Sequence, residues 1–192
     1  MICIINLHRV FTMDDYKIIA SKTIFEIPSR IRIIHDTLEH NGRKFPYVYI
    51  EGSAGGAATV AADDQNQLIL TRQYRHAIRR VIYDLPAGRL NSGEDPLQGA
   101  RREFEEETGL YPNTFVHLGY FSQFPSTINV GMTLFFARDL TPTKQNLDEG
   151  EELEVVRLPL ADVLQMITRD ELIDGSLQLG VLLALQKGLI KT

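Results

Sequence analysis

The sequence predicts an α/β protein in which a mixed β-sheet lies between helices, with a small β-rich unit at its N-terminus. Three observations predict this fold. Segments rich in β-branched residues recur along the chain, one helix of about a dozen residues interrupts them near the middle, and apolar residues at helical spacing return near the C-terminus. Because strands and helices alternate irregularly, we expect a mixed sheet rather than a purely parallel one.

The first fifty residues have the pattern of a three-stranded unit. Its expected strands span residues 18–27, 30–38 and 45–51. Asn41-Gly42 is a strong hairpin signal, because both positions of a tight hairpin turn favour residues that tolerate a positive φ. The glycine- and alanine-rich stretch 52–56 is the expected boundary. We therefore expect a β-rich unit over residues 1–52 and a second domain over residues 53–192.

The second domain is expected to alternate strands and helices. Strands are predicted over residues 57–62, 68–74, 81–85, 115–121, 132–137 and 153–158, and helices over residues 96–108, 160–167 and 177–189. A polar turn at 63–66 separates the first two strands. The helix at 160–167 has apolar residues spaced three, four and seven apart, which is typical of one buried helical face. Asp174 or Ser176 is expected to cap the last helix.

Composition and charge narrow the class of protein. The chain has 192 residues, a formal net charge of −5 and a single cysteine, Cys3. The acidic balance argues against nonspecific binding to nucleic acid or to a membrane surface. No apolar run approaches the roughly 18 residues of a membrane-spanning helix. The N-terminal residues lack a basic leader, so we expect a cytoplasmic protein.

The segment 88–110, which reads GRLNSGEDPLQGARREFEEETGL, contains a helix whose ends follow from local rules. Asp95 is a favourable N-cap residue, and Pro96 suits the first helical position because its missing N–H has no helical partner there. Gly109 suits the left-handed conformation that often follows a helix. These signals place the helix at residues 96–108.

Three glutamates share one face of this helix. Glu103, Glu106 and Glu107 are spaced i, i+3 and i+4, which places them within an arc of roughly 100°. Carboxylates this close repel one another unless a cation neutralises them, and hard divalent cations prefer carboxylate oxygens. Arg102 can hold one of these carboxylates or bind a phosphate with two parallel donors. Gly99, one turn earlier, is expected to leave room for an ion or a phosphate.

An ordinary solvated helix face can also carry such a run of acids. The wider pattern argues against that explanation. Gly88, Glu94 and the stretch REFEEETGL at residues 102–110 follow the spacing G-x5-E-x7-R-E-apolar-x-E-E-x-G-apolar. Seven fixed identities match by chance at about one in 10⁸ to 10⁹ starting points. The segment resembles the Nudix box at every specified position.

The resemblance implies a fold, a reaction and a set of roles. Nudix hydrolases have a mixed sheet sandwiched between helices, and they cut diphosphate linkages with a divalent cation, here Mg²⁺ or Mn²⁺. The implied metal ligands are the backbone carbonyl of Ala87 and the side chains of Glu103, Glu106 and Glu107. Arg102 is implied to orient the glutamates, and Glu94 to support the metal site or the start of the helix.

Two flanking segments resemble one branch of the family, the ADP-ribose and nucleoside-diphosphate-sugar pyrophosphatases. They are TRQYR at residues 71–75 and DLPAG at residues 84–88. Arg72 and Arg75 are therefore candidates for binding substrate phosphate. The N-terminal β-rich unit resembles the part of that branch that forms a homodimer.

The substrate stays open between ADP-ribose and another nucleoside diphosphate sugar, because residues 124–130 lack the acid that ADP-ribose enzymes carry there. In either case the expected products are a nucleoside monophosphate and a sugar phosphate. SQFPS at residues 122–126 resembles part of the NADH pyrophosphatase signature, so cleavage of NADH or another dinucleotide is an alternative. A non-catalytic, nucleotide-sensing Nudix domain is another, and the intact box argues against it.

Hydrolysis needs a general base that takes a proton from water. One source is the box itself, with Glu106 as a candidate. The other is the acidic loop at residues 147–152, where Glu149 and Glu151 align best with the loop acid of the ADP-ribose branch. A merely solvated loop is the alternative explanation of these acids.

Overall fold

The computed structural model describes residues 15–28 and 30–191, and the chain divides into two compact units. The first unit ends at Ser53 but also contains Ser126–Asn129, and the second contains Ala54–Pro125 and the residues from Val130 onward. The short piece at 126–129 belongs to the first unit because it continues that unit's sheet. Ile50 donates its N–H to Thr127 O at 2.7 Å, and its carbonyl accepts from Asn129 N at 3.2 Å.

The first unit is a three-stranded antiparallel sheet. Its strands are β1 (Lys17–Ile27), β2 (Ile31–His40) and β3 (Arg43–Gly52), in the order β1-β2-β3. Asn41 and Gly42 both have positive φ, at 50° and 73°, as a two-residue hairpin turn between β2 and β3 requires. The hairpin predicted from these two residues is therefore confirmed.

The second unit contains a seven-stranded sheet. Its strands are β4 (Gly56–Ala62), β5 (Gln67–Arg75), β6 (Arg80–Asp84), β7 (Ala87–Arg89), β8 (Leu110–Phe121), β9 (Met132–Pro142) and β10 (Leu153–Pro159). The main path runs β10-β5-β4-β9-β8, with β6 paired to β5 and β7 paired to β4. The β4–β9 pair is parallel and the others are antiparallel, so the predicted mixed sheet is confirmed.

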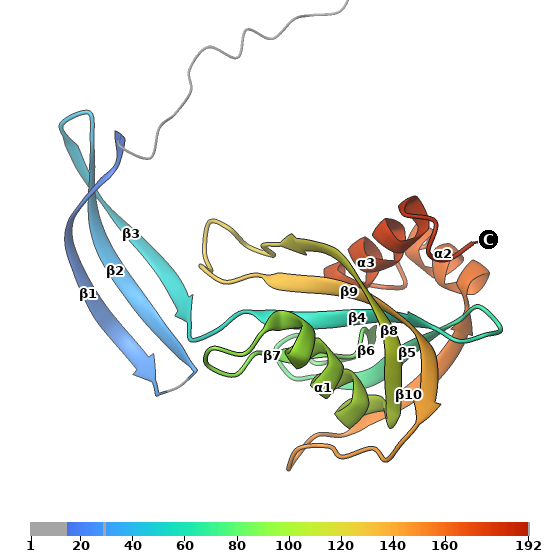
Figure 1. Cartoon of the computed structure of the whole chain (residues 1–192). Coiled ribbons are helices and arrows are strands. Elements are labelled where there is room, and N and C mark those ends of the chain that lie inside the picture. The colour runs from blue at the N-terminus through green and yellow to red at the C-terminus, as the bar shows by residue number, and fades with distance from the viewer. Residues whose placement is uncertain (1–14, 29, 192) are drawn as a thin grey trace, which may run out of the picture. The chain divides into compact units, whose positions relative to one another are not determined.

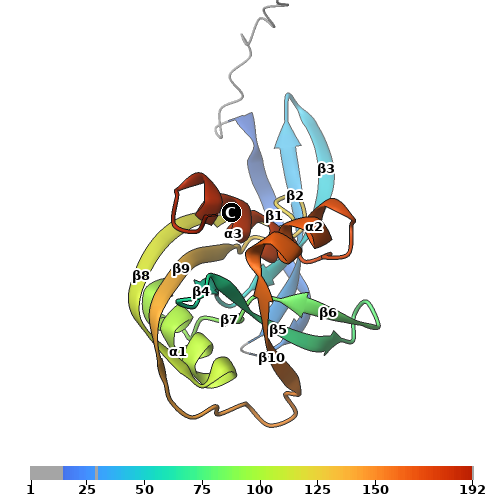
Figure 2. The same cartoon turned by 90° about the vertical axis from the view of Figure 1, so that its right-hand side faces the viewer.

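Helices cover both faces of this sheet (Figure 1). They are α1 (Pro96–Thr108), α2 (Leu160–Thr168) and α3 (Gly175–Gln186). Alternate residues of β4 show the separation, because Ala61 packs in one apolar cluster with Phe104 of α1, whereas Val60 packs in another with Val181 of α3. Figure 2 shows α1 on the opposite side of the strands from α2 and α3. This is the predicted α/β/α sandwich.

Several boundaries differ from those predicted. The structure extends β8 back to Leu110 and β9 on to Pro142, and α3 begins at Gly175 and ends at Gln186. Pro112 is tolerated within β8 because β8 lies at the end of the sheet, where its one partner among the described strands is β9. Asp174, rather than Ser176, caps α3, since its carboxylate accepts from Leu177 N at 2.7 Å. None of the helices in the described ranges is long and apolar enough to cross a membrane.

The strands around β4 diverge, and this divergence positions the box. The C-terminal end of β4 pairs with β5, through Ala61 and Ala62. Its N-terminal end pairs instead with β7, where Ala57 lies opposite Gly88 and Ala58 opposite Ala87. The short strand β7 therefore brings the first glycine of the box against the sheet directly beside α1.

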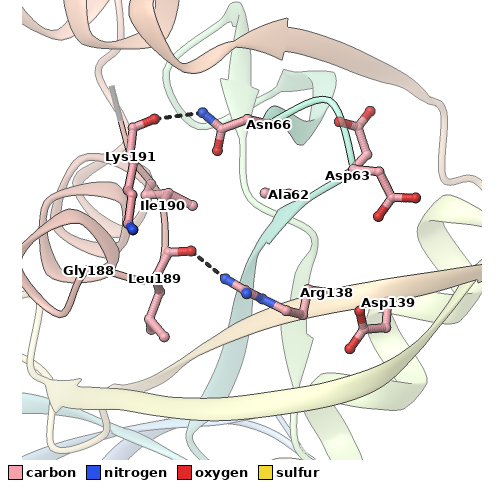
Figure 3. Close-up of a pocket in the computed structure, with 10 residues that line it drawn as sticks. Ala62, Asp63, Asn66, Arg138, Asp139, Gly188, Leu189, Ile190 and Lys191 are labelled. Atoms are coloured by element: carbon pink, nitrogen blue, oxygen red, sulfur yellow. Dashed lines mark hydrogen bonds between the residues drawn. The ribbon is translucent and has the colours of Figure 1, made fainter.

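A cavity of about 410 Å³ lies where the β4–β5 turn meets the C-terminal residues (Figure 3). Asn66 donates to Lys191 O at 2.7 Å, and Arg138 donates to Leu189 O. The residues lining this cavity include none of the predicted site residues. These two bonds tie the C-terminal segment to the sheet.

Candidate active site

The box helix has the ends that the sequence predicts. The side chain of Asp95 accepts from Leu97 N at 3.0 Å and from Gln98 N at 3.3 Å, and Pro96 is the first helical residue. Gly109 follows the helix with φ 66° and ψ 28°, in the left-handed region. These caps fix the length of α1 and thereby the relative positions of its glutamates.

Arg102 gathers three carboxylates. It donates from Nε and Nη2 to the two oxygens of Glu94, at 3.0 Å each. Its Nη1 donates to Glu103 Oε1 at 2.8 Å and to Glu106 Oε2 at 3.1 Å, so one nitrogen holds both side chains. These contacts restrict Glu103 and Glu106, and the role of Arg102 in orienting them for a metal stays a prediction.

The charges of this cluster have consequences for protonation. Hydrogen bonds from Arg102 and from Asn91 N hold the pKa of Glu94 down to about 2. The same carboxylates raise the pKa of Arg102, so its guanidinium stays charged. Burial raises the pKa of Glu103, with Arg102 opposing this effect and the negative charges of Glu106 and Glu151 adding to it.

Glu107 is the most buried of the three predicted metal ligands, with 5% of the residue exposed. Its Oε2 accepts from Ala87 N at 3.0 Å, which links the helix to β7. Its pKa is raised to about 8, chiefly by burial and also by the carboxylates of Glu103 and Glu151, while the bond from Ala87 N and the charge of Arg75 oppose the shift. A buried carboxyl among like charges favours a proton or a cation.

The two glycines of the box are required for different reasons. A Cβ on Gly88 would overlap the carboxylate of Glu103, so any larger residue there would displace that side chain. The prediction that Gly99 leaves room for an ion is wrong. A Cβ on Gly99 would overlap the side chain of Leu90, and Gly99 is itself buried. The space beside it is therefore filled by packing against the loop that precedes α1.

The acidic loop places one of its two candidate bases near the cluster. The negative charge of Glu151 raises the pKa of both Glu103 and Glu107, so its carboxylate lies within electrostatic range of the box face. Its Oε2 accepts from Asp148 N at 3.2 Å within a turn that contains Gly150 at φ 85°. No comparable interaction joins Glu149 to the box glutamates among the described residues.

Gln145 and Asn146, which precede the acidic loop, are functional candidates that the sequence analysis did not identify. Asn146 donates its N–H to Glu106 O at 2.8 Å, and Gln145 Nε2 donates to Glu107 O at 2.7 Å. Gln145 lies 38 residues from Glu107 in the chain, and no local pattern marks the pair. Only the folded sheet, in which the β9–β10 connection runs past the end of α1, reveals them (Figure 2).

The two predicted phosphate-binding arginines already have acidic partners. Arg75 donates from Nε to Asp84 Oδ2 at 2.7 Å, and its guanidinium lies near enough to Glu107 to lower that residue's pKa. Burial raises the pKa of Asp84, while Arg75 opposes this effect. Arg72 forms an exposed pair with Glu154 at 3.2 Å. Of the two arginines, Arg75 is thus the one that the structure brings to the box face.

Over residues 15–28 and 30–191, no three acidic, histidine or cysteine side chains already surround one point as metal ligands. The predicted ligands are engaged otherwise, since Glu103 and Glu106 bond Arg102 and Glu107 bonds Ala87 N. The donor set is nevertheless suited to a hard divalent cation, because it consists of carboxylate oxygens with a single compensating arginine.

Comparison with known proteins identifies the family. The family model of the NUDIX domain matches residues 53–177, well over half of the chain. The chain belongs to the Nudix hydrolase family. Nudix hydrolases in general need divalent metal ions, which agrees with the oxygen-rich donor set on α1.

Individual relatives of this Nudix hydrolase cover most of its length. It is 31% identical to an ADP-ribose pyrophosphatase of Bacillus subtilis (strain 168), over 84% of this chain and 88% of the relative. It is 34% identical to a methanol dehydrogenase activator of Bacillus methanolicus, over 66% of this chain and 70% of the relative. The crystal structure of an ADP compounds hydrolase matches with a TM-score of 0.83 and 24% identity, covering 93% of this chain and 98% of that one. At that identity the last match shows the fold alone.

Proposed function

We propose that this Nudix hydrolase cleaves the diphosphate of ADP-ribose or a related nucleoside diphosphate sugar, releasing a nucleoside monophosphate and a sugar phosphate. The observation that carries the proposal is the carboxylate cluster that Arg102 gathers on α1, with Glu107 buried beside it and Glu151 nearby. The similarity to the Bacillus subtilis ADP-ribose pyrophosphatase supports the substrate class.

We propose Mg²⁺ or Mn²⁺ as the metal, held by Glu103, Glu106, Glu107 and the carbonyl of Ala87. Such a cation would neutralise the diphosphate and lower the pKa of attacking water. The protein contributes the positions of the ligands. Arg102 restricts Glu103 and Glu106, and the bond from Ala87 N restricts Glu107, so the carboxylates share one face before the metal arrives.

Glu151 is proposed as the general base, in preference to Glu149 and to Glu106. Its carboxylate lies near the box face but is not tied to Arg102, which leaves it able to accept a proton. In the step, the water oxygen bonds to one phosphorus, its proton passes to Glu151, and the bridging P–O bond breaks. Arg75, held by Asp84 beside Glu107, is proposed to contact a substrate phosphate, and Arg72 to reach it from the same strand.

The first unit is proposed to form a homodimer interface. On β1, Ile18, Ile24 and Phe25 are each at least half exposed. Exposed apolar side chains on an edge strand are typical of a surface that another chain covers. Light scattering across a range of protein concentrations is expected to give the mass of two chains, and a single-chain mass at every concentration would contradict the proposal.

A hydrolysis panel tests the function. The protein is assayed with Mg²⁺ or Mn²⁺ on ADP-ribose, several nucleoside diphosphate hexoses, NADH and dinucleoside polyphosphates, and products are identified by mass. Preferential release of a nucleoside monophosphate and a sugar phosphate supports the proposal. Preference for NADH would move the assignment to dinucleotides, and binding without any turnover would indicate a nucleotide sensor.

Matched variants test the roles. Glu151→Gln is expected to lower kcat by about a hundredfold or more, since general-base catalysis contributes on the order of 10²–10⁴. Glu107→Gln is expected to lower kcat strongly as well, because it removes a proposed metal ligand. Glu149→Gln, in the same loop, is the control and is expected to stay within about threefold of wild type. Wild-type turnover by Glu107→Gln at saturating metal would show that Glu107 is not a metal ligand. A larger loss of kcat for Glu149→Gln than for Glu151→Gln would assign the base to Glu149.

A further inference from the structure

We propose that Gln145 is a positioning residue, which holds the acidic loop to the C-terminal turn of α1 and thereby sets where Glu151 lies relative to the box glutamates. The inference rests on the proposed function, because it assumes that Glu151 acts as the base. It concerns a residue outside the box whose side chain bonds a backbone carbonyl of α1.

The contacts begin at the end of α1, where the last carbonyls of a helix have no intrahelical partner. The carbonyl of Glu105 is satisfied locally, by the N–H of Gly109. The carbonyls of Glu106 and Glu107 accept instead from residues 143–146, through Asn146 N and Gln145 Nε2. The two residues with these carbonyls are also predicted metal ligands.

The approach of the two segments is close. Thr143 N donates to Gly109 O at 2.7 Å, and a Cβ on Gly109 would lie only 3.0 Å from Gln145 N. Gly109 is therefore needed for its positive φ and also because the neighbouring backbone leaves little room. Three hydrogen bonds thus join residues 143–146 to the end of α1, and only the bond from Gln145 comes from a side chain.

The acidic loop follows residues 143–146 directly in the chain. Asp148 lies two residues beyond Asn146 and begins a turn. The carbonyl of Asp148 accepts from Glu151 N at 3.0 Å, and the N–H of Asp148 donates to Glu151 Oε2. The position of the Glu151 carboxylate is therefore determined by a short chain of contacts that starts at α1. Gln145 is exposed, so replacing it removes one of these contacts without opening the core.

Loss of one neutral hydrogen bond is expected to shift the population of the anchored loop by about five- to tenfold. Gln145→Met keeps most of the side-chain length but has no N–H donor, and Gln145→Ala removes both. Each is expected to lower kcat by about that factor with little change in KM, because the base is misplaced while the metal ligands remain. Lys144→Ala is the matched control, since Lys144 is exposed and has no hydrogen bond or ion pair in the described part of the chain.

The deciding measurement combines Gln145→Met with Glu151→Gln in the full-length protein. If Gln145 acts through Glu151, the double variant is no slower than Glu151→Gln alone, whereas a purely structural role would make the two losses multiply. Multiplying losses, or wild-type kcat for both Gln145 variants, would overturn the inference while the proposed function stands. Wild-type kcat for Glu151→Gln would overturn both the base assignment and the inference.

Discussion

Arg102 holds Glu94 with two parallel hydrogen bonds, in which Nε and Nη2 each lie 3.0 Å from a different oxygen of the carboxylate. Glu94 lies before α1 and Arg102 lies within it, so this pair joins the loop to the helix. The remaining guanidinium nitrogen is left for Glu103 and Glu106. One side chain therefore links the start of the box to two of its predicted metal ligands.

Lysine cannot replace Arg102 in this arrangement, because an ammonium group lacks the planar fork that meets both oxygens of a carboxylate. Arg102→Lys is expected to lower the free energy of unfolding by about 1–3 kcal/mol, measured by urea denaturation. Arg101→Lys is the neighbouring control. Arg101 packs its guanidinium over the rings of Tyr111 and Phe115 and forms no ion pair among the described residues, so its loss is expected to be smaller. Equal losses would contradict the assigned role of Arg102.

Gly88→Ala is expected to lower kcat by at least about tenfold, because the added Cβ overlaps the Glu103 carboxylate and moves a metal ligand. For the same reason, the variant is expected to need a higher metal concentration than wild type to reach half of its maximal activity. Gly175→Ala is the control, since a Cβ there meets no atom within 4 Å at the first position of α3. A Gly88→Ala enzyme with unchanged kcat and metal requirement would show that Glu103 can adjust at no cost.

The stability of the metal-free protein is expected to depend on pH through Glu107. Its pKa is about 8 in the folded protein, against 4.5 for an ordinary glutamate. Between these values the folded state holds a proton that the unfolded state has lost, so this group's contribution to stability decreases as pH rises through that window. Glu103, whose pKa is also raised, acts in the same direction. With a chelator present, the free energy of unfolding is expected to fall less steeply with rising pH for Glu107→Gln than for wild type.

The raised pKa of Glu107 also predicts that metal binding releases protons. A carboxyl that is mostly protonated at pH 7 has to ionise before it binds a cation. Addition of Mg²⁺ to metal-free protein in weak buffer is expected to release up to about one proton per chain, and Glu107→Gln is expected to release less. Equal release by both proteins would mean that Glu107 does not ionise on metal binding.

The N-cap of α1 gives a prediction that concerns stability alone. Asp95→Ala removes the acceptor for Leu97 N and Gln98 N and is expected to cost about 1 kcal/mol of unfolding free energy. Asp64→Ala, in the β4–β5 turn, removes a carboxylate that makes no hydrogen bond in the described structure, and is expected to change stability by less than about 0.5 kcal/mol. Similar losses would show that the cap contributes little.

The sequence by itself determined the features that depend on neighbouring residues. Asp95, Pro96 and Gly109 set the ends of α1 because caps act within one helical turn, and Asn41-Gly42 set the hairpin between β2 and β3 because its turn requires positive φ. The shared face of the box glutamates follows from helical spacing alone. Recognition of the family required no more than this one segment.

Only the tertiary structure decided the features that depend on contacts between distant residues. Gly99 packs on Leu90 instead of opening a site, and Gly88 is brought against Glu103 by the short strand β7, which no local pattern predicts. Gln145 meets the carbonyl of Glu107 only because the sheet returns the chain to the end of α1. Local propensities act over a few residues, whereas these contacts are set by strand pairing and packing across the domain, and for this reason they appear only in the folded chain.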